Sequence, residues 1–214
     1  GGALRKRPAR VIGITGSPGA GKSTLVAQLV GEYTRRAKLD PKLGRCAVIA
    51  FDPMSPITSG ALLGDRLRVD FNTLDERVFY RSLAISGEDY RWVPEIVELI
   101  GGVEDRGIER REGSGSYNTL FIETVGAGQN ETQIRKYVDR TAVVLTPGMG
   151  DAVQMDKAGI LEIADVFVCN KADHPGENEL VRDLRDVAGR RPIIETVATR
   201  GQGVPELLDA LVGK

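Results

Sequence analysis

Cysteine, histidine and aromatic residues are scarce in this chain of 214 residues, which has two cysteines, one histidine and 5% aromatic residues. The cysteines, Cys46 and Cys169, are far apart in sequence and each lies inside an apolar run. We interpret them as small core residues in a reducing compartment. The histidine, His174, stands beside a Pro-Gly turn and is predicted to be an exposed loop residue rather than a catalytic one. So few cysteine and histidine ligands argue against a site for nickel or a similar metal.

The sequence also has no long apolar run and almost no net charge. No run approaches the ~20 apolar residues of a membrane-spanning helix, and no secretory signal is visible. The formal net charge is −1, so no overall positive field would attract nucleic acid. We expect a cytoplasmic protein, or alternatively the mature form of an organelle-matrix protein, with neither a membrane nor a nucleic acid as its partner.

A glycine-rich stretch, 16–24, reads GSPGAGKST and matches the phosphate-loop pattern G-x-x-x-x-G-K-[ST] without a mismatch. An apolar run at 11–15 precedes it and helical spacing at 22–37 follows it, as the motif requires. Glycines let successive backbone N–H groups point at the oxygens of a polyphosphate. We expect Lys22 to reach the β- and γ-phosphates and Ser23 to bind Mg²⁺. The residues expected to contact the nucleotide here are Ser17, Pro18, Gly19, Ala20, Gly21, Lys22, Ser23 and Thr24.

Short apolar runs and segments of helical spacing alternate along the chain. The runs are continuous rather than alternating, which is typical of strands covered on both faces of a parallel sheet. We therefore predict an α/β fold of the P-loop NTPase type, with an open, doubly wound, mostly parallel sheet flanked by helices, in one domain over residues 1–214. The predicted strands are 11–15, 46–51, 119–123, 141–146, 165–169 and 192–196, and the predicted helices are 22–37, 90–101, 130–138, 176–188 and 204–212.

Three stretches depart from this rhythm. Residues 1–9 are basic and are expected to form a flexible lead-in. Residues 52–89 hold many turn formers and charges between the second predicted strand and the next helix. Residues 106–117 include the sequence EGSGS, a composition typical of a mobile surface loop.

A second nucleotide motif, Asn170-Lys171-Ala172-Asp173, directly follows the fifth predicted strand and matches the N-K-x-D pattern of GTP-binding proteins. Asp173 can accept hydrogen bonds from the N1–H group and the exocyclic amine of guanine, whereas adenine offers no such pair. Asn170 is expected either to bond the base edge or to brace the phosphate loop, and the stem of Lys171 to lie over the ring. Backbone N–H groups for the base oxygen are expected after the last predicted strand, from Thr196, Val197 and Ala198.

Acidic residues at strand ends supply candidate Mg²⁺ ligands. Glu123 closes the third predicted strand and could hold Mg²⁺ directly or through water. Asp52 follows the second strand, and Asp65 lies further along, near the same edge of the sheet. Gly126 could bring its N–H group close to the γ-phosphate. Its segment would then be ordered by a nucleoside triphosphate and released by the diphosphate. Gln129 is expected either to orient the attacking water or to have a structural role.

Several separate blocks of sequence between residues 11 and 211 together resemble the MeaB/ArgK/MMAA group of G-proteins. Beyond the phosphate loop, the blocks are 52–53, 60–66 (GALLGDR), 80–84 (YRSLA), 123–129 (ETVGAGQ), 147–154 (PGMGDAVQ), 157–160, 163–165 and 170–173. The resemblance implies a GTPase chaperone of adenosylcobalamin-dependent acyl-CoA mutases, of which methylmalonyl-CoA mutase is the usual partner. Such proteins couple GTP to the loading of intact cofactor and help to expel damaged cofactor.

By that likeness, residues 147–158 form an additional switch, switch III, which relays the nucleotide state to the mutase, while 52–89 and 124–131 are switches I and II. The alternative for switch III is a charged helix entry with no signalling role. Family members usually carry a helical arm before the phosphate loop and a dimerising arm at the C-terminus. In this sequence the phosphate loop begins at residue 16 and the last predicted helix ends at residue 212. We therefore expect a trimmed chain, a short form, or a G domain cut from a fusion with the mutase, with a homodimer as one alternative. The residues that the resemblance makes candidates for coupling to the mutase are Asp151, Gln154 and Lys157.

The leading hypothesis is a regulatory GTPase that slowly hydrolyses GTP to GDP and phosphate and is accelerated by its mutase. One alternative is a metallochaperone GTPase, which would need clustered cysteine and histidine ligands. Another is a kinase for a small molecule, although the sequence shows no separate segment that would bind an acceptor. Under the leading hypothesis the groups expected to act in hydrolysis are Lys22, Asp52, Asp65, Glu123 and Gln129.

Overall fold

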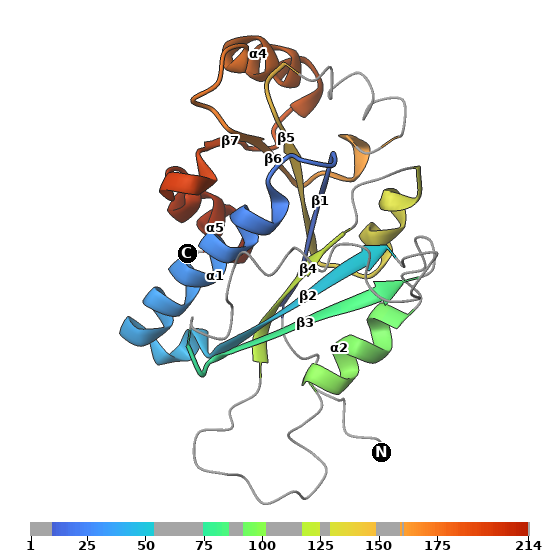
Figure 1. The fold of residues 1–214 in the computed structure, drawn as a ribbon, viewed down its shortest axis with the longest axis vertical. Coiled ribbons are helices and arrows are strands. Elements are labelled where there is room, and N and C mark those ends of the chain that lie inside the picture. Colours follow the sequence, from blue (N-terminus) through green and yellow to red (C-terminus); the bar gives the residue numbers. More distant parts are fainter. Residues whose placement is uncertain are drawn as a thin grey trace, which may run out of the picture.

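The computed structural model is built on one parallel β-sheet, which has seven strands within the described residues 10–53, 75–85, 92–101, 117–124, 129–148, 159 and 161–213. Every pair of neighbouring strands is parallel, in the order β3-β2-β4-β1-β5-β6-β7 (Figure 1). The predicted α/β fold with a parallel sheet is thus confirmed. The strands are β1 (Arg10–Gly16), β2 (Arg45–Pro53), β3 (Val78–Ile85), β4 (Tyr117–Glu123), β5 (Arg140–Leu145), β6 (Val166–Asn170) and β7 (Ile193–Thr196).

The strand order reverses beside β1, which lies between β4 and β5. From β1 the chain runs outward to β2 and β3 and returns to β4, and then it continues on the other side of β1 through β5, β6 and β7. In open α/β sheets, ligands bind outside the carboxyl ends of the strands at such a reversal. The phosphate-loop stretch begins where β1 ends, so it lies at this point.

Helices cover both faces of the sheet. On one face, α1 (Lys22–Leu39) and α5 (Val204–Val212) share a core with strand residues such as Ile12 and Val168, and Figure 1 shows the two helices side by side. On the other face lie α2 (Val93–Gly101) and α4 (Glu177–Ala188). None of the described helices is both long and apolar enough to cross a membrane. The short 3₁₀ helices are η1 (Pro41–Leu43), η6 (Gln129–Lys136), η7 (Leu161–Ile163) and η8 (Ala198–Arg200).

Neighbouring residues of the central strands point into different layers, and both layers are buried. In β1, Ile12 belongs to the α1 and α5 core, whereas Val11 belongs to the core beneath α2. In β6, Val168 and Phe167 divide in the same way, and both are fully buried. This burial on both faces is the reason why the strands appear in the sequence as continuous apolar runs.

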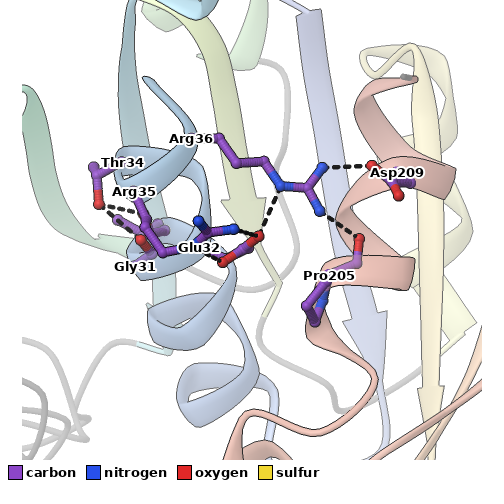
Figure 2. A network of polar contacts seen from close by, with 8 residues as sticks. Gly31, Glu32, Thr34, Arg35, Arg36, Pro205 and Asp209 are labelled. Atoms are coloured by element: carbon purple, nitrogen blue, oxygen red, sulfur yellow. Dashed lines mark hydrogen bonds and ion pairs between the residues drawn. The ribbon is translucent and has the colours of Figure 1, made fainter. Parts of the chain in front are cut away.

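One arginine ties α5 to the helix that begins at the phosphate loop. The guanidinium group of Arg36 in α1 contacts the carboxylate of Asp209 in α5 and donates a hydrogen bond of 3.0 Å to the backbone oxygen of Pro205 (Figure 2). Its Nε atom donates to Glu32, one turn back, at 2.7 Å. The two helices are therefore joined by polar contacts as well as by their shared core.

The seventh strand, β3, was not among the six predicted strands. It lies within the stretch 52–89, and it is an edge strand, bonded only to β2 among the described strands. Phe79 is 39% exposed and Arg81 is exposed, so the strand has no continuous apolar run to mark it. No strand was predicted within 52–89, and residues 78–85 form one, while 54–74 and 86–91 lie outside the described residues.

The predicted helices match α1, α2, α4 and α5 within three residues at either end, but the segment 130–138 is different. It forms the 3₁₀ helix η6, and the amide of Tyr137 donates to the oxygen of Ile134 in the tighter i to i+3 pattern. Among its described side chains only Ile134 and Val138 are buried apolar residues, with Tyr137 half-buried beside them. Ile134 and Val138 pack so closely on β1 that a Cβ atom on Gly13 would lie 3.3 to 3.4 Å from them. Two apolar anchors are too few to form the continuous apolar face of an α-helix.

Candidate nucleotide-binding site

The phosphate-loop stretch joins β1 to α1 at the carboxyl end of the sheet. Its backbone has left-handed φ angles of 138°, 76° and 86° at Gly16, Gly19 and Gly21. A Cβ atom on Gly16 would lie 2.1 Å from the backbone oxygen of Val144, and one on Gly21 would lie 2.5 Å from the Nδ2 atom of Asn170. Glycine is therefore required at positions 16 and 21 by both backbone conformation and space.

The amino end of α1 is suited to an anion. Gly21 is the N-cap residue, no described side chain caps the helix, and the first turn carries no acidic residue. The positive end of the helix dipole therefore lies at the loop, and no acidic residue of the helix's own first turn offsets it. A glycine-rich loop leading into such a helix end binds phosphate through backbone N–H groups.

Lys22 places a positive charge inside the loop. Its side chain is buried, and Nζ donates hydrogen bonds to the backbone oxygens of Gly16 at 2.6 Å and Ser17 at 2.9 Å. These contacts hold the ammonium group across the loop that the phosphates are predicted to occupy. An ammonium group carries a positive charge as well as hydrogen-bond donors, so its position in the loop suits an anion.

Ser23 and Glu123 meet at the carboxyl end of the strands, beside the phosphate loop. The hydroxyl group of Ser23 donates a hydrogen bond of 2.7 Å to Oε1 of Glu123. Glu123 ends β4, stands opposite Ile14 of β1 in the parallel register, and is 2% exposed. Two residues 100 positions apart in sequence are thus brought together by the pairing of β1 with β4.

The Ser23 and Glu123 pair fits Mg²⁺, which prefers oxygen ligands. The two oxygen atoms are 2.7 Å apart, close to the ~3 Å between adjacent ligands of an octahedral Mg²⁺ ion. Asp52 lies at the end of β2, at the same carboxyl end of the sheet, because Ala50 of β2 stands opposite Glu123. The side chain of Asp52 and the whole of Asp65 lie outside the described part of the chain, so their predicted places on the metal remain predictions.

A buried pair of threonines locks the end of β4 to the start of the phosphate loop. The Thr124 hydroxyl donates a 3.0 Å hydrogen bond to the Thr15 hydroxyl, and the Thr124 amide donates to the backbone oxygen of Ile14 at 3.0 Å. Both threonines have no exposed surface. Sequence reasoning missed this pair, although each residue stands directly beside a residue of a recognised motif. The contact fixes the position of Glu123, the last residue of β4, relative to the phosphate loop.

Asn170, the first residue of the N-K-x-D motif, makes three hydrogen bonds to two other segments of the chain. Its Nδ2 atom donates to the backbone oxygen of Ala20 at 2.8 Å, and its Oδ1 atom accepts from the Thr196 hydroxyl at 3.0 Å and the Ala198 amide at 3.2 Å. Asn170 is 2% exposed. Of the two roles expected from the sequence, the contacts here are those of a brace for the phosphate loop.

Lys171 and Asp173 lie next to this brace. Lys171 has a left-handed φ of 60°, and its Nζ atom donates to the backbone oxygen of Gly19 at 3.0 Å, so the side chain reaches back along the phosphate loop. The Asp173 side chain is 32% exposed and faces Arg200, whose Nη2 atom lies 3.4 Å from Oδ2. Arg200 did not feature in the sequence reasoning, and its position two residues after Ala198 was the available signal.

The backbone after β7 forms a tight loop beside the motif. The amide of Val197 donates to the oxygen of Gln202 at 3.1 Å, and the amide of Ala198 bonds to Asn170. The oxygen of Thr196 accepts from the amide of Ala172 at 3.1 Å. The loop is therefore adjacent to Asp173, as the predicted contact with a base requires, while that contact stays a prediction.

Most of the other residues predicted to act as switches lie outside the described residues. Gly126 and residues 149–158 of the predicted switch III lie outside the described residues. Gln129 begins η6, and its side chain is outside the description. The predicted lead-in 1–9 and all but the last residue of the predicted loop 106–117 lie outside it too.

The cysteines and the histidine stay apart from this site. Cys46 belongs to the layer under α1 and α5 and Cys169 to the layer under α4, on opposite faces of the sheet. Both thiols are buried, and burial raises the pKa of each to about 12. His174 is exposed in a turn. Among the described residues, no three or more histidine, cysteine or acidic side chains gather as a metal cluster would require.

Comparisons with known proteins agree with this geometry. A family model described as methylmalonyl Co-A mutase-associated GTPase MeaB matches residues 4–213. A Pyrococcus abyssi protein with GTPase in its name is 41% identical over 95% of this chain, which spans 61% of that protein. The fused isobutyryl-CoA mutase of Nocardia farcinica is 39% identical over 85% of this chain, corresponding to 16% of its own length.

A solved structure shares the fold. The crystal structure of a LAO/AO transport system kinase superposes with a TM-score of 0.62 at 24% identity, covering 96% of this chain and 58% of that one. At that identity the likeness concerns the fold alone. It agrees with the P-loop architecture predicted from the sequence.

Proposed function

The chain belongs to the family of methylmalonyl-CoA mutase-associated GTPases, MeaB, and from this membership we propose that it binds GTP with Mg²⁺ and hydrolyses it to GDP and phosphate. The observation that carries the proposal is the contact of Asn170 with both the phosphate loop and the loop after β7. That contact supports the proposal because it joins the proposed phosphate-binding loop to the loop proposed to recognise guanine. A protein that bound only phosphate would not need the second element.

The proposed hydrolysis is an in-line attack of water on the γ-phosphate. Lys22 and the backbone N–H groups of the loop would neutralise the negative charge of the transferring phosphoryl group. Ser23 and Glu123 would hold Mg²⁺, with Asp52 and Asp65 as further proposed ligands. When bound, the ion would offset charge on the phosphate oxygens. Gln129 remains our candidate for orienting the water.

Guanine selectivity is proposed to come from Asp173. An ionised carboxylate accepts two hydrogen bonds from guanine N1–H and the exocyclic amine, and against adenine it would be left unpaired. The Lys171 stem would complete the base site. The amides of Val197 and Ala198, which donate to Gln202 and Asn170, would contact the base oxygen only by exchanging those bonds. We propose that the protein acts in the cytoplasm, in line with its low cysteine content.

The proposed partner is an adenosylcobalamin-dependent acyl-CoA mutase, whose cofactor loading and protection the GTPase would control. The family membership and the mutase relative of Nocardia farcinica support this proposal. The regions 52–89, 124–131 and 147–158 are proposed as the switches that pass the nucleotide state to the mutase. Asp151, Gln154 and Lys157 are the residues to substitute first in a test of that relay.

The decisive measurement compares nucleotide binding and turnover by the chain and by Asp173→Asn, with and without a candidate mutase. We expect GTP to bind at least a hundredfold more tightly than ATP, and Asp173→Asn to shift the preference toward xanthine nucleotides, whose C2 carbonyl suits an amide donor. Slow hydrolysis that rises when mutase is added would support the chaperone role. Selective GTP binding with no response to the mutase would remove the partner, and equal binding of ATP would remove the guanine assignment.

A further inference from the structure

Arg200 stands beside the carboxylate that is proposed to read guanine, and nothing in the N-K-x-D motif requires a cation there. Its Nη2 atom lies 3.4 Å from Oδ2 of Asp173. The two side chains are 68% and 32% exposed, so solvent weakens the pair without abolishing it. From this contact we infer that Arg200 is a specificity-determining residue that competes with guanine for Asp173, an inference that rests on the proposed guanine site.

The backbone around Arg200 holds the side chain in this place. The amide of Arg200 donates to the oxygen of Val197 at 2.9 Å, and Gly201 takes a left-handed φ of 68°. The loop is closed by the bridge between Val197 and Gln202. Gly203 sits so close to β7 that a Cβ atom on it would lie 2.0 Å from the oxygen of Glu195. These contacts hold the backbone of Arg200 in a closed loop beside the N-K-x-D motif, to which the loop is joined by the bond from the Ala172 amide to the Thr196 oxygen.

The charges explain why the pair competes with guanine rather than assisting it. Guanine presents donors to Asp173, namely N1–H and the exocyclic amine, and a guanidinium group presents donors to the same carboxylate. Two sets of donors at one carboxylate divide its negative charge, and the cation repels the donor edge of the base. Xanthine presents a C2 carbonyl in place of the amine, and the cation attracts that oxygen. Arg200 therefore weakens guanine binding and reduces discrimination against xanthine.

The test is Arg200→Ala, with equilibrium and stopped-flow binding of a fluorescent ribose-labelled GDP and competition by unlabelled GDP and xanthosine diphosphate. Exposed ion pairs contribute little, so we expect GDP affinity to rise about two- to fivefold and GDP release to slow correspondingly. The GDP-to-xanthosine-diphosphate selectivity should rise as well. Arg200→Lys, which keeps the charge, should stay within twofold of the parent chain.

Arg182→Ala is the matched control, because Arg182 is 74% exposed on α4 and faces a carboxylate, Asp183, at 3.9 Å. It removes the same charge outside the proposed base site and should leave both affinities unchanged. In 1 M salt the Debye length falls to about 3 Å, so the difference between Arg200→Ala and the parent chain should shrink. A rigidifying or structural role of Arg200 would not produce this salt dependence.

Weaker or unchanged GDP binding by Arg200→Ala would overturn the inference, and so would an equal gain in Arg182→Ala. If the parent chain bound GDP no better than ADP, the proposed guanine site would fail and the inference with it. The parent chain could instead select GDP over ADP while Arg200→Ala binds GDP with the same affinity as the parent. In that case the guanine site would stand, and only the competing role of Arg200 would fall. Circular dichroism and the melting temperature of each variant report whether the chain is folded.

Discussion

At the scale of single residues, the site depends on glycines whose requirement differs from one position to the next. Gly19 and Gly21 both have left-handed φ angles, but a Cβ atom on Gly19 would meet nothing within 4 Å. A Cβ atom on Gly21 would press on Asn170. The two positions therefore separate the cost of backbone conformation from the cost of displacing the Asn170 brace.

We predict that Gly21→Ala lowers the free energy of unfolding by about 3 kcal/mol and Gly19→Ala by about 1 kcal/mol. Both variants carry the strain of a left-handed alanine, but only the first displaces Asn170 from its hydrogen bond to Ala20. Urea denaturation followed by circular dichroism measures both values. Equal losses in the two variants would mean that Asn170 yields at no cost, and would contradict its role as a brace.

At the scale of elements, the junction of α1 and α5 depends on a carboxylate held between two arginines. Glu32 accepts hydrogen bonds from Arg35 at 2.7 Å and from Arg36 at 2.7 Å, and its side chain is 12% exposed (Figure 2). The hydrogen bond from Arg35 has the largest effect on the pKa of Glu32 and, with Arg36 adding and burial opposing, lowers it from 4.5 to about 2. Because the folded pKa is depressed, Glu32 stabilises the fold above pH 4.5 and loses this effect as the pH falls toward 2.

We predict that Glu32→Gln lowers the free energy of unfolding by about 1–2 kcal/mol at pH 7, because charge-assisted hydrogen bonds are replaced by neutral ones. The difference from the parent chain should shrink between pH 4.5 and pH 2. Denaturant titrations across this range measure it. Glu179→Gln, the same change at an exposed position in the first turn of α4, is the control and should lower the free energy of unfolding at pH 7 by less than about 1 kcal/mol. A gap that stayed constant down to pH 2 would disprove the assignment to Glu32.

Which elements were predictable depended on whether their signal was local. Continuous apolar runs indicated six strands, of which the five central ones are buried on both faces and β7 is an edge strand. The phosphate-loop and N-K-x-D motifs marked the loops in which they lie. Strand β3 was missed because Arg81 and Ser82 interrupt its apolar residues, and Phe79 and Arg81 are exposed rather than buried under a helix. The contacts of Thr15 with Thr124 and of Arg200 with Asp173 were also missed, because they depend on strand register and loop geometry that no short pattern encodes.

At the scale of the whole molecule, the sheet separates two buried layers that each contain one thiol. Cys46 lies in the α1 and α5 layer and Cys169 in the α4 layer, and neither has any exposed surface. Both layers use the same strands, so neither can open widely without exposing the other. We therefore expect the molecule to unfold as one cooperative unit.

We predict that alkylation of the native chain with iodoacetamide labels Cys46 and Cys169 at rates within about threefold of each other, because both thiols react only after global opening. The raised pKa of each thiol lowers its reactivity further in the folded state. Mass spectrometry of the digested protein follows the two sites in one sample. Fast labelling of one thiol alone would show that its layer opens independently. Unfolding in urea, which should equalise and accelerate both rates, is the control.

The three hydrogen bonds of Asn170 also bear on protein engineering. A designer who transplants the phosphate loop into another scaffold carries over the turn but not the amide that supports Ala20 from across the sheet. A substitution at Asp173 that changes the base preference should leave the rest of the site unaltered, because that side chain is partly exposed and contributes nothing to the brace. A substitution at Asn170 should not act on one function alone, because it alters the phosphate loop and the loop after β7 together.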